Sequence, residues 1–155
     1  MFKNGEYVIY HNTEYIYIYC FENKQKNMVR LASYDRQSLN DGFYTNRTEE
    51  YMQEHGFRCF KDVPRSKITE AYEIRTYALY RNIEFNIYRS KDNQIRIVKY
   101  CSSGRDDELA KKLQTWQFSV FDADKFHVSY DSYISVDDPE LEIIEQKNEL
   151  DIDKL

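Results

Sequence analysis

Apolar and polar residues alternate in short runs along most of the chain, a pattern typical of β-strands rather than of helices. The runs are rich in Tyr, Ile, Val and Phe, residues that pack well on a pleated, half-buried surface. They lie at 6–10, 14–21 and 28–34, and again at 73–80, 84–90 and 94–101. The pattern therefore predicts an α+β chain that contains two three-stranded antiparallel meanders.

The second group of predicted strands repeats the first. Tyr7 to Tyr15 matches Tyr77 to Phe85, with five positions identical or nearly so, and Val29 to Tyr34 matches Ile95 to Tyr100. Four residues are missing from the second copy, and they fall in a polar turn, where a duplicated module tolerates a change of length. We expect two tandem copies of one β-rich module and a short acidic tail, at 1–71, 72–148 and 149–155.

Each copy is expected to continue with a helix, a further strand and a short closing helix. A first helix over 47–55 has Asn46 and Glu49 as a capping box and Gly56 at its end. Its counterpart over 104–114 has Ser103 as the cap. The expected later strands lie at 57–61, 116–121 and 126–134. The closing helices are expected at 65–71 and, beginning at Pro139, at 138–148.

The tight turns and the outward strand faces also recur. Asn12 and Asn82 lie where a two-residue hairpin turn needs a positive φ. Arg30 and Arg96 take equivalent outward positions, where pairing with Glu14 and Glu84 across the strands would account for them. The run from Asp122 to Asp124 is typical of a turn between strands.

The duplication assigns the faces of the second strand. By equivalence with the second copy, Tyr15 and Tyr17 point to the core. Ile16 and Ile18 then lie on the opposite face, where the second copy has Tyr88. A strand that is apolar on both faces and left exposed would aggregate. We therefore expect the other copy, a second subunit or a protein partner to cover Ile16 and Ile18.

Charge is distributed unevenly along the sequence. The formal net charge is −5, and the last twenty residues, with eight acids and two lysines, carry −6, so the first 135 residues carry +1. This balance disfavours nucleic-acid binding, which needs a basic surface. The acidic end either attracts a basic partner or forms a solvated helix. The candidate partner-binding residues are Asp137, Asp138, Glu140, Glu142, Glu145, Ile16, Ile18 and Tyr88.

Motifs of cofactor, metal and nucleophile chemistry are missing from the sequence. The four glycines are isolated, so no phosphate-binding loop is present, and the three cysteines are far apart with no Cys-x-x-Cys pair. Cys59 beside His55 is a weaker candidate for a nucleophile than for a packed thiol. We expect a non-enzymatic protein with no cofactor and no metal.

The apolar runs also bear on the location of the protein. The longest of them, Tyr15 to Phe21, is too short to cross a bilayer. The first residues lack the apolar core of a signal peptide. We therefore expect a cytoplasmic protein that makes no membrane contact, and the oligomeric state stays open.

One segment suggests a family. The run from Val63 to Tyr80 contains Ser-Lys-Ile-Thr-Glu-Ala-Tyr-Glu-Ile and resembles a linker found in small tandem-module proteins of Gram-positive bacteria. That resemblance implies two β-rich modules and a role as an immunity protein, which neutralises a toxin delivered by a neighbouring cell. The sequence departs from the duplicated pattern after Trp116, where 122–135 has no evident counterpart in the first copy.

Two functions of different classes are therefore predicted. The first is a binder that occludes the active site of a cognate toxin, with acidic residues facing a basic partner and aromatic residues as anchors. The second is a small-ligand-binding or catalytic domain with its site between the two modules. A tight complex with a basic protein would favour the first, and a cleft lined by converging polar groups would favour the second.

Overall fold

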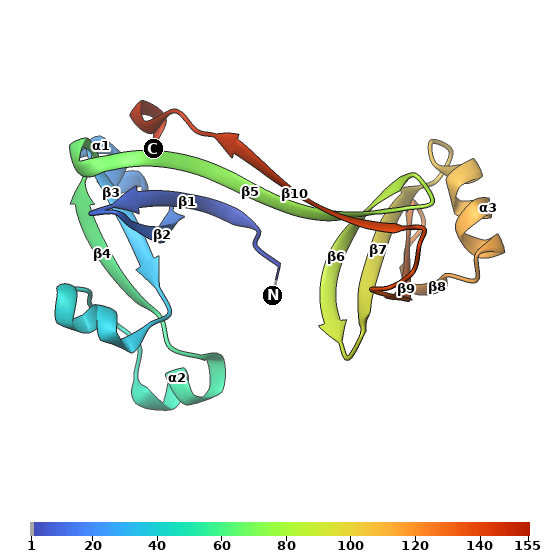
Figure 1. Ribbon diagram of the computed structural model, residues 1–155, viewed down its shortest axis with the longest axis horizontal. Helices are drawn as coiled ribbons and strands as arrows, with labels where there is room; N and C mark the ends of the chain where they lie inside the picture. The colour runs from blue at the N-terminus through green and yellow to red at the C-terminus, as the bar shows by residue number, and fades with distance from the viewer. Residues whose placement is uncertain (1) are drawn as a thin grey trace. The chain divides into compact units, whose positions relative to one another are not determined.

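The computed structural model describes residues 2–155, apart from the side chains at positions 89 and 90, and confirms the α+β class (Figure 1). The strands pair antiparallel in the order β4-β3-β2-β1-β5-β6-β7-β9-β8, and β10 pairs with β5. The strands are β1 (Gly5–Tyr10), β2 (Thr13–Ile18), β3 (Met28–Ser33), β4 (Cys59–Pro64), β5 (Ile68–Tyr80), β6 (Ile83–Lys91), β7 (Gln94–Ser102), β8 (Ser119–Ala123), β9 (His127–Ser135) and β10 (Leu141–Glu149). The α-helices are α1 (Phe21–Gln25), α2 (Glu49–His55) and α3 (Asp107–Thr115).

The chain forms two compact units. The first unit contains Asn4–Arg75 together with Lys147–Leu155, and the second contains Thr76–Gln146 together with residues 2–3. The first unit holds β1 to β4 and the start of β5. The second holds the end of β5, β6 to β9 and α3, which lies alongside the strands of its unit (Figure 1). The longest α-helix in residues 2–155, α3, has nine residues, far fewer than a bilayer-spanning helix needs.

The predicted duplication is visible in the hairpins. Tyr10 pairs with Thr13, and Tyr80 pairs with Ile83, so each copy opens with a hairpin of two turn residues. Asn12 and Asn82 have φ values of 61° and 63°, as the sequence predicted, because asparagine tolerates the left-handed conformation that such a turn requires. The next ladder keeps the same register in both copies, since Tyr17 pairs with Leu31 and Ile87 pairs with Ile97.

Two hydrophobic cores form at equivalent positions of the copies. Each core gathers the inward residues of its own strands and fills the space under the sheet with large apolar side chains. The first contains Val8, Tyr17, Val29, Leu31, Phe43, Cys59, Val63, Ile68, Ala71 and Leu155. The second contains Ala78, Tyr80, Phe85, Ile95, Ile97, Cys101, Leu113, Phe118, Tyr130 and Ile134.

The two predicted closing helices are wrong, because both segments are strands. Residues 65–71 hold a single 3₁₀ turn over Arg65–Lys67 before β5 begins at Ile68. Residues 138–148 lie mostly in β10. Pairing decides both outcomes: β5 bonds along β1, and the Arg81 amide donates to the Glu140 carbonyl at the start of β10. Each copy therefore ends in a strand that returns beside its own first strand.

The segment 122–135 does have a counterpart in the first copy. It contains β9, which pairs with β7 just as β4 pairs with β3, and Tyr130 and Ile134 occupy core positions like those of Cys59 and Val63. Sequence comparison misses this equivalence because the segments between the strands differ. The first copy inserts a 3₁₀ helix and α2, whereas the second inserts α3 and β8.

The structure also differs from the sequence prediction in where some helices and one strand end. The first helix is capped by Thr48, whose hydroxyl accepts from the Tyr51 amide, rather than by Asn46. The second begins at Asp107, so Ser103 is not its cap. The second strand of the first copy stops at Ile18, and the short helix α1 takes up Phe21, which was expected to extend the strand. Local propensity is weak over such short stretches, so tertiary packing decides them.

The acidic end of the chain packs against the first unit. Leu155 is buried in the first core, and Leu150 and Ile152 pack against that core. The Leu150 amide also donates to the Ala71 carbonyl. Residues 149–155 are therefore an ordered part of the first unit and not a frayed helix end.

The predicted faces of β2 are confirmed, and the covering of Ile16 is found within the first unit. Tyr17 lies in the first core, and Tyr15 is partly buried against it. On the opposite face Ile16 packs on a small cluster that contains Tyr7, Tyr72 and Ile74. Ile16 and Ile18 are half-buried, so neither forms the fully exposed apolar surface that the sequence left open.

Candidate functional site

The outer sheet face of the second unit carries a group of exposed aromatic side chains around one arginine. We call this group the aromatic platform. Tyr88 lies on β6, Tyr100 on β7, Phe121 on β8 and Tyr133 on β9, and all four are exposed by 44–56%. Outward positions in four neighbouring strands thus place large apolar rings on one solvent-facing surface, a feature uncommon outside interaction sites.

Arg96 holds the centre of the aromatic platform. Its guanidinium lies 4.8 Å from the centroid of the Phe121 ring and 5.9 Å from that of Tyr88, and Tyr133 stands opposite it across the β7–β9 ladder. Its Nε donates to an Asp131 carboxylate oxygen at 2.7 Å. The cation is therefore fixed between two rings and a carboxylate, which keeps the surrounding rings in place.

The expected partners of the two recurring arginines were wrong. Arg96 bonds Asp131 rather than Glu84, and Arg30 makes two bonds to Asp62, at 2.8 and 3.0 Å, rather than pairing with Glu14. The carboxylates come from β9 and β4, strands that the sequence could not assign to a ladder with β7 and β3. The Arg30 bonds hold the pKa of Asp62 below its usual value.

Tyr88, a predicted site residue, is joined to a second tyrosine. Its hydroxyl lies 2.6 Å from that of Tyr100, and this hydrogen bond, followed by partial burial, raises the pKa of Tyr100. The two hydroxyls present a paired donor and acceptor at the edge of the rings. The aromatic platform therefore combines apolar surface with polar groups already positioned.

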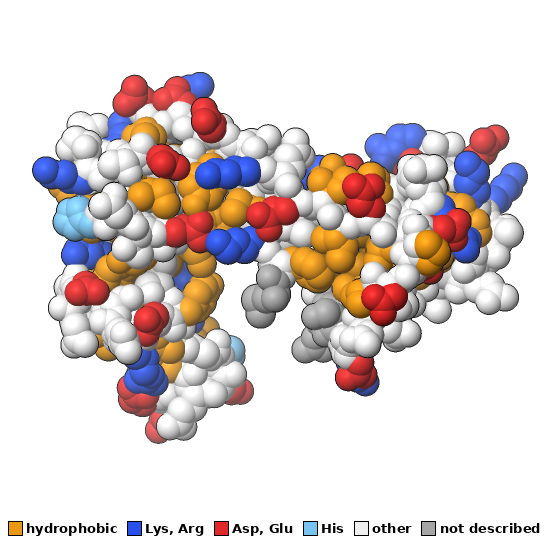
Figure 2. Space-filling model, in the orientation of Figure 1, with side chains coloured by type: hydrophobic (Ala, Val, Ile, Leu, Met, Phe, Trp, Pro, Cys, Tyr) orange, Lys and Arg blue, Asp and Glu red, His pale blue; other side chains and the backbone are white. Residues whose placement is uncertain are grey.

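The predicted acidic residues lie in the turn before β10 and along β10 itself. Asp137 is exposed, and Asp138 accepts from the Glu140 amide, which shapes the turn. Glu140 pairs with Arg81 at 2.9 Å. Glu142 and Glu145 are exposed on β10. Figure 2 shows charged side chains of both signs along the surface over β5 and β10. Of the five acids, Asp137, Glu142 and Glu145 are those whose carboxylates make no hydrogen bond or ion pair in the described residues.

The predicted candidates are divided between the two units. Asp137, Asp138, Glu140, Glu142, Glu145 and Tyr88 belong to the second unit, whereas Ile16 and Ile18 belong to the first. Sequence reasoning missed Phe121 and Tyr133 of the aromatic platform. Arg96, between the inward Ile95 and Ile97, marks the outer face of β7 in the sequence, but the neighbours of that face on β8 and β9 require the strand order.

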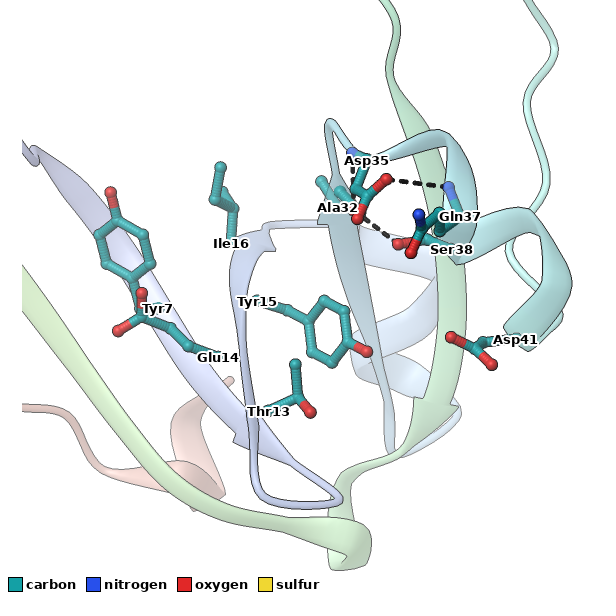
Figure 3. Close-up of a pocket in the computed structure, with 11 residues that line it drawn as sticks. Tyr7, Thr13, Glu14, Tyr15, Ile16, Ala32, Asp35, Gln37, Ser38 and Asp41 are labelled. Atoms are coloured by element: carbon teal, nitrogen blue, oxygen red, sulfur yellow. Dashed lines mark hydrogen bonds between the residues drawn. The ribbon is translucent and has the colours of Figure 1, made fainter. Parts of the chain in front are cut away.

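A polar cavity of about 480 Å³ lies in the first unit, where β2 and β3 separate. Carboxylates, phenols and hydroxyls dominate its wall, as Figure 3 shows. The polar lining residues include Glu14, Tyr15, Ser33, Asp35 and Asp41. The Asp35 side chain accepts from the Gln37 amide at 2.9 Å, and the Ser33 hydroxyl lies 2.7 Å from that of Ser38.

Negative charge shapes the electrostatics of this cavity. Burial, with the charge of Asp41 as the second cause, raises the pKa of Tyr15, whose hydroxyl points toward Asp41 in Figure 3. Burial and the hydrogen bond that its hydroxyl donates to Glu14 raise the pKa of Tyr72 to about 12. Tyr72 lies outside the cavity wall, beside Glu14. The cavity is suited to a cation rather than to an anion because three carboxylates line it, those of Glu14, Asp35 and Asp41.

The groups available for catalysis are ordinary. Cys59 is buried, and burial raises the pKa of its thiol, the opposite of what an activated nucleophile requires. His55 stacks on Tyr51 and bonds the Tyr51 carbonyl within α2. His127 lies 3.5 Å from Asp124, which also accepts from two backbone amides. The turn predicted at Asp122 to Asp124 begins only at Asp124, because Asp122 is still paired in β8. Residues 2–155 contain no cluster of three or more potential metal ligands.

Fold and sites together define an α+β protein of two duplicated antiparallel modules, with an aromatic sheet face in one and a polar cavity in the other. The chain belongs to the family described as uncharacterised conserved protein UCP033725, which matches residues 2–153. No curated protein and no solved structure matches the chain significantly. The family covers nearly the whole sequence, so both modules are part of what its members share.

Proposed function

We propose that this protein is a non-enzymatic binding inhibitor, an immunity protein that occludes the active site of a cognate bacterial toxin. The aromatic platform is the observation that carries the proposal. Tyrosine and arginine are enriched among the residues that dominate binding energy at protein interfaces, and here four exposed rings surround one fixed arginine. Tyrosine in particular supplies a large contact area at a small cost in side-chain entropy.

The acidic residues near β10 give the proposal its second element. Asp137, Glu142 and Glu145 are exposed in the same unit as the aromatic platform. Charges of this kind raise the association rate with a basic partner, whereas buried aromatic rings slow dissociation. We therefore propose a basic toxin domain as the partner.

Association kinetics with a candidate toxin domain, purified from the product of the neighbouring gene, test the charges. The triple variant Asp137→Lys, Glu142→Lys and Glu145→Lys avoids Asp138 and Glu140, which hold the local structure. We expect it to lower the on-rate about tenfold or more at low salt and to flatten its salt dependence. A matched control reverses three exposed acids of the first unit, Glu22, Glu50 and Glu54. An equal effect of both triple variants would assign the change to net charge alone.

The dissociation rate tests the aromatic platform. Tyr88→Ala and Phe121→Ala should each raise the off-rate, by about thirtyfold for a residue that contributes about 2 kcal/mol. Tyr19→Ala is the matched control, since Tyr19 is at least as exposed but lies in the first unit. A candidate toxin that binds wild type and both platform variants with the same off-rate would overturn the role of the platform. A panel of neighbouring-gene products with no binding at all would overturn the proposed function.

The second function predicted from the sequence, small-ligand binding, has an observation of its own. The cavity between β2 and β3 is about 480 Å³, within the size range of small-molecule sites, and polar groups converge on it. This cavity lies within the first unit. Its chemistry supports a separate proposal.

A further inference from the structure

Because the chain is duplicated, the cavity of the first unit can be compared with the equivalent place in the second copy. The ladder between the second and third strands of each copy has a last pair at equivalent positions, Ile16 with Ala32 and Asn86 with Val98. The next residue of the third strand is Ser33 in the first copy and Lys99 in the second. The two copies therefore differ in one side chain at the point where the strands separate.

In the second copy the side chain of Lys99 lies at the point where the second and third strands separate. Its ammonium group donates to the carbonyl oxygen of Glu84 at 2.8 Å, and the side chain is partly buried. Lys99 also lowers the pKa of Asp106, although bonds from Ser102 and Arg105 contribute more to that shift. In the second copy a primary ammonium thus donates to a strand carbonyl at the point where the two strands separate.

The first copy has a serine in place of this lysine, and carboxylates line the cavity there. Glu14, equivalent to Glu84, lines the cavity, and so do Asp35 and Asp41 at the two ends of the 3₁₀ helix that follows β3. Neither Asp35 nor Asp41 has an ion pair within the described residues. Ser33 is too short to fill the space that Lys99 fills in the second copy.

One lysine of the first unit lies nearby and is already engaged. Lys61 donates to the backbone carbonyl of Asp41 at 2.6 Å and lies 5.6 and 5.7 Å from the ring centroids of Tyr10 and Phe43. It does not line the cavity. Its ammonium is thus held on the core side of β4, and the two carboxylates still face the cavity.

We propose that the cavity beside Ser33 is a binding site for a primary ammonium group supplied by another molecule. The ammonium occupies the place that Lys99 fills in the second copy and is held by Asp35, Asp41 and the hydroxyls of the wall. A compact, strongly hydrated ammonium suits several separate oxygen acceptors better than a planar guanidinium does. Two sources share this chemistry, a lysine side chain of a protein partner and a free aliphatic diamine. The site stands independently of the proposed toxin.

Amide chemical shifts under ligand titration test the site with small probes. The probes are Nα-acetyl-lysine methylamide, its uncharged analogue Nα-acetyl-norleucine methylamide, and cadaverine. We expect the lysine probe to shift the amides of Ser33, Gln37 and Asp41, and the norleucine probe to leave them unchanged. Tighter binding of the capped lysine than of cadaverine would identify a protein side chain as the source, and the reverse order would identify a free diamine.

A reciprocal exchange between the copies sharpens the test. Ser33→Lys supplies the ammonium internally and should abolish the shifts, whereas Lys99→Ser should open the equivalent place and create a second set of shifts near Phe85. Asp41→Asn, which leaves Ser33 and its bonds intact, should weaken the lysine probe about fivefold. Glu108→Gln, an exposed charge on α3, is the matched control and should change nothing.

Three results would overturn the proposal: norleucine and lysine probes that bind alike, a folded Ser33→Lys variant that binds the lysine probe as wild type does, or shifts confined to other parts of the chain. If Ser33→Lys does not fold, an unchanged affinity in Asp41→Asn would overturn it. None of these outcomes depends on a toxin, so failure here leaves the proposed function standing, and loss of toxin binding leaves this site standing.

Discussion

Asp62 joins two segments that are far apart in the sequence. Its carboxylate accepts two bonds from Arg30 and one from the Asn23 amide, at 2.7 Å. The side chains of Arg30 and Asp62 are 30% and 27% exposed, so solvent weakens the pair without removing it. The Arg30 bond is the main reason why the pKa of Asp62 lies below its usual value, and the Asn23 bond adds to it.

This arrangement gives a pH-dependent stability. A carboxyl group whose pKa is lowered by folding stabilises the protein above its unfolded pKa, and that contribution is lost as the pH falls through the folded value. Asp62→Asn should therefore lower the free energy of unfolding by about 1 kcal/mol at pH 7, a value below that of a fully buried pair. The difference from wild type should shrink steadily from about pH 5 downward.

Urea denaturation at a series of pH values measures this effect. Glu145→Gln removes an exposed carboxylate of β10 and serves as the control, with little expected change at any pH. A destabilisation by Asp62→Asn that is as large at low pH as at pH 7 would contradict the ionic origin of the contribution. It would then have to come from packing or from the Asn23 bond alone.

At the scale of elements, the sequence predicts hairpins well and closing strands poorly. The turns at Asn12 and Asn82 depend on the backbone preference of a few local residues, so the sequence is enough to place them. β5 and β10 instead form because partner strands far along the chain supply their hydrogen bonds. The alternation of Tyr72, Ile74, Ala78 and Tyr80 supported the strand predicted at 73–80, but it does not extend back into 65–71, where the helix was predicted.

Only part of the candidate site could be predicted from the sequence. Tyr88 was found because the duplication assigned it to an outer face. Phe121 was not, because a register shift between Val120 and Asp122 breaks the β8–β9 ladder at this residue, and no local pattern reports such an irregularity. The acidic candidates were found by composition alone, so the sequence could not separate Glu140, which pairs with Arg81, from the freely exposed Glu142.

The ordered end of the chain leads to a prediction at this scale. Leu155 is only 5% exposed and lies in the first core, although the sequence placed it in an acidic tail. Leu155→Ala should lower the free energy of unfolding by about 2 kcal/mol or more, because it removes most of a buried leucine side chain from the first core. Ile143→Ala on β10, where the side chain is 38% exposed, is the control and should cost under about 1 kcal/mol. Equal, small effects in thermal denaturation would contradict the packing of Leu155.

At the scale of the whole molecule, the duplicated sequence has produced two cores and not one. Leu31 and Ile97 are fully buried at equivalent positions, each surrounded by residues of its own unit. The strands around Leu31 and Ile97 pair in the same register, but the helices and strands inserted beside them differ between the two copies. The chain therefore uses one strand framework twice and varies what lies beside it, which is how a cavity arises in one copy and a filled position in the other.

Separate cores predict separate responses to core damage. Leu31→Ala and Ile97→Ala should each lower the free energy of unfolding by about 2–5 kcal/mol, since each removes most of a fully buried aliphatic side chain. Native-state hydrogen exchange should then speed up first in the unit that carries the change, because local opening follows the contacts that were lost. In Leu31→Ala the amides of β2 and β3 should exchange faster while those of β6 and β7 keep their protection. The reverse should hold for Ile97→Ala. If either substitution speeds exchange evenly through both units, the two cores unfold as one cooperative body, and the duplication is a feature of sequence and fold without independence in stability.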